Sequence, residues 1–129
     1  MSWNLKPDRP IYSQLLEYIQ IFIISGKYKP GEKLPSVRDL AEEASVNPNT
    51  MQKALAELER VGLVYTQRTN GRFITEDENM IRMLKENVAQ AQIREFFDNM
   101  ELLGFSIQES VQLIIETGKE RQNECDFKM

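Results

Sequence analysis

The segment 47–60 carries the side chains of this chain that are best suited to recognising another molecule. At helical spacing, Asn49, Gln52 and Lys53 lie on one polar face. Ala56 lies on the same face and is small enough to let the helix approach a surface closely. Asparagine and glutamine amides pair with adenine edges, and lysine binds guanine or a phosphate. The face therefore predicts contacts with DNA bases, although an ordinary solvated helix face explains this segment alone equally well.

Three arginines near this segment favour the same kind of ligand. Arg68 and Arg72 flank the dipeptide Asn70-Gly71, which is a strong signal for the tip of a hairpin. Arginines at such a tip suit a narrow minor groove or the phosphates beside it, and the alternative is that they only keep the hairpin soluble. Arg38 also has two interpretations, since it could contact DNA or pair with a neighbouring carboxylate.

Helix start and stop signals divide residues 10–75 into three helices and a hairpin. Ser36 with Asp39 predicts a capping box, and Asn47-Pro48 predicts another helix start. The expected elements are a first helix opening at Pro10 and closing at Gly26, a second starting at Ser36, a third from Pro48 to about Val61, and strands at 64–67 and 72–75. Two short helices followed by a hairpin are the layout of a winged helix-turn-helix, which places one helix in the major groove of DNA.

The composition is compatible with DNA binding and argues against catalysis. The net charge is −4, but residues 1–75 carry a net +2 and residues 76–129 a net −6, so the N-terminal part is mildly basic. The chain has no histidine, which removes the Ser-His-Asp triad and the commonest zinc ligand, so we expect no catalytic residue, metal or cofactor. A single cysteine, Cys125, and the lack of a long apolar run predict a cytoplasmic protein without a membrane span.

The C-terminal part predicts two further helices and contact with a second copy of the chain. Residues 77–103 form one long helical pattern that ends at Gly104, and Ser106 opens a capping box for a last helix. Two helices cannot enclose all of their own apolar side chains, so we expect a homodimer interface, and the alternative is packing against the first domain. The expected interface residues are Leu84, Val88, Phe96, Phe97, Met100, Leu103, Val111 and Ile114. The expected domains are residues 1–75, which bind DNA, and residues 76–129, a helical dimerisation tail.

Residues 10–75 resemble the DNA-binding domain of GntR-type bacterial transcription regulators. The matching residues are Pro10-Ile11-Tyr12, Gln14-Leu15, Gly26, Pro30-Gly31, Leu34-Pro35-Ser36-Val37-Arg38, Leu40-Ala41, Val46-Asn47-Pro48-Asn49-Thr50, Ala54, Leu58-Glu59, Gly62-Leu63-Val64, Gly71 and Phe73-Ile74. These motifs span about half of the chain and are highly specific as a set. One position departs from the family, which usually carries Gly-x-Gly at the wing tip, where this chain has Thr69-Asn70-Gly71. The resemblance implies a mainly α fold with a small β-hairpin, namely an N-terminal winged helix-turn-helix followed by a two-helix dimerisation segment.

The resemblance also implies a set of DNA contacts. The family uses the arginine that matches Arg38, the first turn of the recognition helix, and the wing around Gly71 in the minor groove. The helical wheel independently selects Asn49, Gln52 and Lys53. The expected DNA-binding residues are Ser36, Arg38, Asn47, Asn49, Thr50, Gln52, Lys53, Arg68, Asn70, Gly71 and Arg72.

The short tail resembles that of the YtrA-type regulators of this family, in which the tail dimerises the protein and the target operon often encodes an ABC transporter. We therefore expect a homodimer that binds an inverted-repeat operator in double-stranded DNA, acts as a repressor and controls a transporter operon. A small-molecule effector is an open addition for which the sequence identifies no ligand. The alternative from another class is a winged-helix protein–protein adaptor without DNA affinity, whose recognition face would be acidic or apolar.

Overall fold

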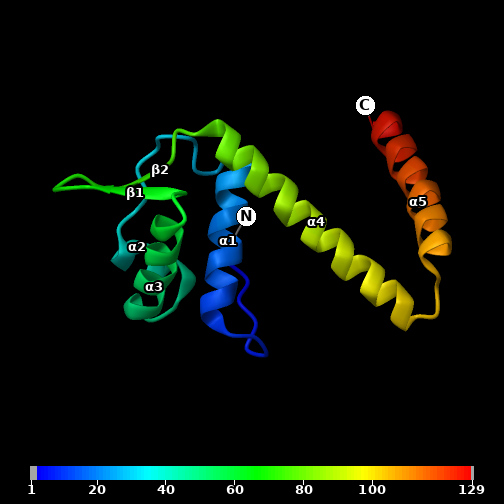
Figure 1. The fold of residues 1–129 in the computed structure, drawn as a ribbon, viewed down its shortest axis with the longest axis horizontal. Helices are drawn as coiled ribbons and strands as arrows, with labels where there is room; N and C mark the ends of the chain where they lie inside the picture. Colours follow the sequence, from blue (N-terminus) through cyan, green and yellow to red (C-terminus); the bar gives the residue numbers. More distant parts are fainter. Residues whose placement is uncertain (1–2, 129) are drawn as a thin grey trace. The chain divides into compact units, whose positions relative to one another are not determined.

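Five helices and one two-stranded antiparallel sheet make up the part of the chain that the structure, a computed structural model, describes: residues 3–128, with side chains up to residue 125 (Figure 1). The elements are α1 (Ile11–Ser25), α2 (Val37–Ala44), α3 (Pro48–Arg60), β1 (Val64–Gln67), β2 (Gly71–Ile74), α4 (Glu78–Leu102) and α5 (Ile107–Lys128). The predicted fold class, mainly helical with a small hairpin, is confirmed. The chain forms two compact units, residues 1–86 and 87–129, and α4 contributes to both. The boundary expected after residue 75 stays a prediction.

The core of the first unit forms because apolar residues recur every three or four positions along its helices. Helix α3 packs against α1 and α2, and the hairpin strand β1 packs against α3. The largest fully buried side chains are Leu15, Ile19 and Phe22 of α1, Leu40 of α2, Met51, Leu55 and Leu58 of α3, Val64 of β1 and Ile74 of β2. Because one face of α3 is committed to this core, its opposite face is turned to solvent.

The segment 3–9 is fastened along α1 by paired hydrogen bonds. The Tyr18 hydroxyl accepts from the Asn4 N–H at 3.1 Å and donates to the Asn4 carbonyl at 3.0 Å. The buried Gln14 amide makes a similar pair with the Lys6 backbone, accepting from its N–H and donating to its carbonyl, both at 2.7 Å. The Trp3 ring packs edge-on against Phe22, with centroids 5.1 Å apart. These contacts hold the segment against α1.

Strands β1 and β2 form a short antiparallel hairpin whose last pair joins Gln67 to Gly71. Strand β2 therefore begins at Gly71, one residue earlier than predicted. In the loop, the Asn70 N–H donates to the Gln67 carbonyl at 3.1 Å, and the backbone turns through left-handed conformations at Thr69 (φ +66°) and Gly71 (φ +103°). The Asn-Gly signal correctly identified the tip, but the left-handed residue before Gly71 is Thr69, a β-branched residue for which this conformation is strained.

The predicted helix caps are formed to different degrees. Pro10 is the residue before α1 and not its first helical residue, since its ψ of 130° is not helical. The Ser36 hydroxyl accepts from the Asp39 N–H at 3.1 Å, but among the described residues the Asp39 carboxylate returns no hydrogen bond, so this capping box is half formed. The box of Ser106 and Glu109 is complete, with bonds of 3.0 and 3.1 Å in the two directions. Glutamate completes the box where aspartate does not because its side chain is one methylene longer.

The second unit contains the part of α4 from residue 87 onwards and all of α5. The turn between the two helices includes Gly104, where the backbone is left-handed (φ +95°). The rings of Phe96 and Phe97 contact each other with centroids 6.0 Å apart. Many large apolar side chains of this unit are exposed: Ile93, Phe96, Leu102, Leu103, Phe105, Ile107, Val111, Leu113, Ile114 and Ile115. Among residues 3–128, no helix is both long enough and apolar enough to cross a bilayer.

Candidate nucleic-acid interface

The turn between α2 and α3 fixes the start of the exposed helix. Ser45 adopts a left-handed conformation (φ +57°), and the Val46 N–H donates to the Ala41 carbonyl at 2.9 Å. The Asn47 side-chain oxygen accepts from the Asn49 N–H at 2.8 Å, which caps α3 as predicted. Although its oxygen accepts the capping bond, Asn47 keeps its NH2 group to donate to a ligand.

The solvent face of α3 carries the polar side chains that the helical wheel selected. Asn49, Gln52 and Lys53 are exposed, Ala56 lies beside them, and Thr50 is half-buried. Within residues 3–128, the side chains of Gln52 and Lys53 make no hydrogen bond or ion pair, so their donors and acceptors are free to bind a ligand. This face is neither acidic nor apolar, in contrast to what a protein–protein adaptor would require.

The end of α3 is occupied by an internal ion pair. Arg60 lies 2.6 Å from the Glu57 carboxylate, and both residues are on the surface of the unit. Hydrogen bonds from Arg60 lower the pKa of Glu57 below its ordinary value. Because Arg60 is already paired, the free polar groups of the helix lie in its first half.

Arg38 projects from α2 into solvent. It is exposed, and in the described part of the chain it forms no ion pair with Asp39 or Glu42. The structure therefore does not show the expected alternative, in which Arg38 pairs with a neighbouring carboxylate. Its guanidinium is available to an external ligand.

The two wing arginines occupy different environments. Arg68 is exposed at the tip, whereas Arg72 is half-buried in β2 and its Nε has no hydrogen-bond partner in the described chain. The Tyr65 and Phe73 rings stack with centroids 5.7 Å apart and stiffen the hairpin. A hydrogen bond from the Thr66 hydroxyl to Glu59 ties the hairpin to α3. The wing and the exposed helix therefore hold a fixed relation within one unit.

An open cleft of about 630 Å³ separates the start of α2 from the wing tip. The polar and charged side chains that line it come from both walls: Lys33, Ser36, Asp39, Thr69, Asn70 and Arg72. The sequence had assigned Ser36, Asn70, Gly71 and Arg72 to a DNA interface, and the structure brings these four residues to the same cleft. Lys33 was not selected from the sequence, because it precedes the helix and shares no periodic pattern with the other candidates.

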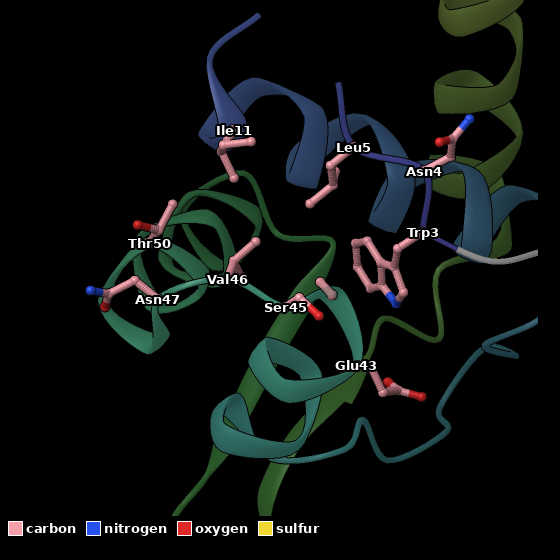
Figure 2. A pocket seen from close by; sticks show the side chains of 10 residues that line it. Trp3, Asn4, Leu5, Ile11, Glu43, Ser45, Val46, Asn47 and Thr50 are labelled. Atoms are coloured by element: carbon pink, nitrogen blue, oxygen red, sulfur yellow. The ribbon is translucent and has the colours of Figure 1, made fainter. Parts of the chain in front are cut away.

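A second groove, of about 590 Å³, lies beside the α2–α3 turn. In Figure 2, Trp3 and Leu5 of the fastened N-terminal segment lie across the groove from Ser45 and Val46 of the turn. Asn47 and Thr50, at the start of α3, also line it. The segment therefore forms one wall of a groove whose other wall is the turn before the exposed helix, an arrangement that the sequence did not indicate.

The predicted interface residues of the C-terminal helices divide into two groups. Leu84 is half-buried and packs against the core of the first unit, together with Met80 and Ile81. The remaining seven belong to the second unit, where Val88, Phe97 and Met100 are half-buried and the others exposed, namely Phe96, Leu103, Val111 and Ile114. Other apolar residues of this unit that were not among the predicted interface residues are also exposed, most prominently Leu102 (85%) and Ile107 (70%).

Comparison with known proteins places this architecture in a family. The model of the gntR family of bacterial regulatory proteins matches residues 11–74. The HTH-type transcriptional regulator YhcF of Bacillus subtilis is 35% identical over 112 residues, which cover 87% of this chain and 93% of YhcF. The chain belongs to the gntR family. The HTH-type transcriptional repressor YtrA of the same organism is 40% identical over 103 residues, covering 75% of this chain and 79% of YtrA.

Solved gntR structures support the same assignment. A GntR family transcriptional regulator from Listeria monocytogenes superimposes with a TM-score of 0.79 at 37% identity and covers 87% of this chain and 98% of its own. The DNA-binding domain of AraR, solved in complex with the operator ORE1, superimposes with a TM-score of 0.50 at 30% identity, over 58% of this chain and 94% of that domain. This gntR member is therefore a DNA-binding transcriptional regulator with a winged helix-turn-helix, as the sequence predicted.

Proposed function

We propose that this gntR regulator is a cytoplasmic, non-enzymatic repressor that binds an inverted-repeat operator as a homodimer. The observation that carries the proposal is the exposed polar face of α3, which presents Asn49, Gln52 and Lys53 beside the wing. Amide and ammonium groups on a helix of this kind match base edges in the major groove. The adaptor alternative is disfavoured because this face offers hydrogen-bonding groups and no apolar patch.

The DNA contacts fall into two groups with different roles. Arg38 and the first half of α3 (residues 47–53) would contact base edges and give sequence preference. Arg68, at the exposed wing tip, and Arg72 would bind phosphates or a narrow minor groove and give affinity for any sequence. Because Arg72 is half-buried, we expect Arg68 to contribute the larger part of the wing's effect.

The dimer proposal rests on the direction of the apolar residues along α4. At about 100° per residue, the side chains of Phe96, Met100 and Leu103 point about a quarter turn away from those of Ile81 and Leu84. Ile81 and Leu84 are covered by the core of the first unit, whereas Phe96 and Leu103 remain 39% and 71% exposed. Exposed apolar side chains also occur on α5, among them Val111 and Ile114, and exposed apolar surface of this kind marks a protein interface. A second copy is the natural occupant, since two-fold symmetry lets the same surface cover itself.

The operator and the regulated genes are the next step of the proposal. Two-fold symmetry in the protein is matched by an inverted repeat in the DNA. A dimer bound over a promoter blocks polymerase, which favours repression. Control of a transporter operon follows only from the likeness to YtrA-type regulators, and a small-molecule effector stays an open addition without a ligand to name.

Footprinting on the DNA upstream of the gene tests this function. The protein should protect two half-sites related by inversion, and binding should persist with excess random duplex. Changing Asn49 or Gln52 to alanine should reduce the preference for this DNA over random duplex. Changing Arg68 and Arg72 together to alanine should weaken binding to both DNAs alike and flatten the dependence on salt. A protein that binds no duplex DNA at low salt would refute the proposal.

A further inference from the structure

Lys33 lies before α2 in the sequence, yet it is held against the wing. Its backbone forms an antiparallel bridge with Phe73 of β2, and the neighbouring Leu34 N–H donates to the Arg72 carbonyl at 2.8 Å. The Lys33 side chain then runs along the hairpin towards its tip. Its Cε lies 3.1 Å from the position that a Cβ atom would take at Gly71, and its Nζ lies 3.9 Å from the same position. The ammonium group is therefore placed beside the first residue of β2.

The charge of Lys33 is not neutralised where it lies. Among residues 3–128, its ammonium group makes no ion pair or hydrogen bond, and the residue is exposed. The cleft that it lines contains one other cation, Arg72, and one carboxylate, Asp39. The cleft therefore has an excess of positive charge, and the Ser36 and Asn70 side chains add groups able to donate hydrogen bonds to an anion.

We propose that Lys33 binds a phosphate of the DNA backbone in the cleft between α2 and the wing. The inference rests on the proposed function, which assigns both walls of this cleft to the DNA interface. A strand that passes from α2 to the wing tip crosses the mouth of the cleft, where a lysine ammonium is a compact charge for a phosphate oxygen. A phosphate contact positions the protein on the duplex without selecting a base. Lys33 thus adds affinity for any sequence and fixes how the wing meets the strand.

The test compares three variants of the full chain on a random-sequence 30-base-pair duplex across a salt series. Lys33→Met removes the charge and keeps the aliphatic stem beside Gly71, and Lys33→Arg keeps the charge. Lys6→Met removes an equal charge outside the cleft, from a residue whose backbone N–H and carbonyl bond to Gln14 of α1. Lys33→Met should weaken binding several-fold and reduce the slope of log affinity against log salt by about 0.9 per protomer. Lys33→Arg should retain the slope of the parent, and Lys6→Met should behave like the parent.

The outcomes separate this inference from the proposed function. If the parent binds the duplex and Lys33→Met keeps its affinity and salt slope, Lys33 does not contact a phosphate. If Lys33→Met lowers the melting temperature and leaves the salt slope unchanged, the residue serves only the packing of the hairpin, and the inference is again overturned. If the parent itself binds no duplex, the failure lies with the proposed function.

Discussion

Replacing Phe96 with glutamate tests the proposed interface of the second unit. Complete burial of a phenylalanine side chain contributes roughly 1.5–3 kcal/mol, and Phe96 is 39% exposed, so covering the remainder contributes roughly 0.6–1.2 kcal/mol per copy. A carboxylate placed in an apolar interface adds a desolvation cost of at least about 1–3 kcal/mol per copy. Because a two-fold interface contains the residue twice, the dimer should lose roughly 3–8 kcal/mol of association free energy.

Sedimentation equilibrium over a range of protein concentrations measures this loss. The parent should be a dimer, and Phe96→Glu should shift the dissociation constant by at least two orders of magnitude. Asn87→Glu is the matched control, because it adds the same charge at an exposed position on the opposite side of the same helix. Circular dichroism should give equal helix content for all three proteins. A Phe96→Glu variant that dimerises as well as the parent would show that this surface is not the interface.

Further predictions concern DNA contacts and local strain. Arg38→Ala and Lys53→Ala should each weaken binding to the operator by about 1–3 kcal/mol in a fluorescence titration. The urea midpoint should not change, since both residues are exposed. Unaltered affinity of both variants would contradict the assignment of these residues to the DNA interface. Thr69→Gly should stabilise the first unit by up to roughly 1.6 kcal/mol in urea unfolding. Relief of the left-handed threonine is worth roughly 1–2 kcal/mol, and the greater freedom of glycine in the unfolded chain offsets roughly 0.4–1 kcal/mol of it. Clear destabilisation would mean that Thr69 makes a compensating contact. Ser106→Ala should remove the cap of α5 and cost about 1 kcal/mol, measured against Ser13→Ala at an exposed position of α1 as control; an equal effect of the two changes would refute the capping argument.

The parts of the fold that local chemistry controls could be predicted from the sequence. The start of α3 followed from Asn47-Pro48, because a side-chain cap and a proline at the first position act within one turn. The buried and exposed faces of α3 followed from the spacing of its apolar residues, and Met51 and Leu55 are indeed buried. The candidate DNA-binding residues on α3 could be predicted in the same way, since a helical wheel also identifies the face turned to solvent.

The features that were missed depend on contacts between distant parts of the chain. Lys33 reaches the wing only because it bridges to Phe73, and no local pattern encodes that pairing. The packing of Trp3 on Phe22 depends on where the N-terminal segment crosses α1. Leu84 was assigned to a dimer interface and packs against the first unit, because the period of an apolar stripe does not say which partner covers it. The left-handed conformation of Thr69 (φ +66°) was not predicted, because asparagine and glycine are the residues that usually adopt it in turns.

The position of the Lys33 side chain against Gly71 affects which substitutions related sequences can accept at these two positions. The Lys33 Cε lies within 3.1 Å of the place where any side chain at position 71 would begin, and a residue other than glycine there would also have to adopt φ +103°. A side chain at position 71 would therefore displace the end of the Lys33 side chain by a few tenths of an ångström. A relative without this glycine needs a different loop because of the positive φ, and its side chain at position 33 would have to shift slightly. We expect an alignment of gntR relatives with this wing length to couple substitutions at positions 33 and 71, although the two residues lie far apart in the sequence.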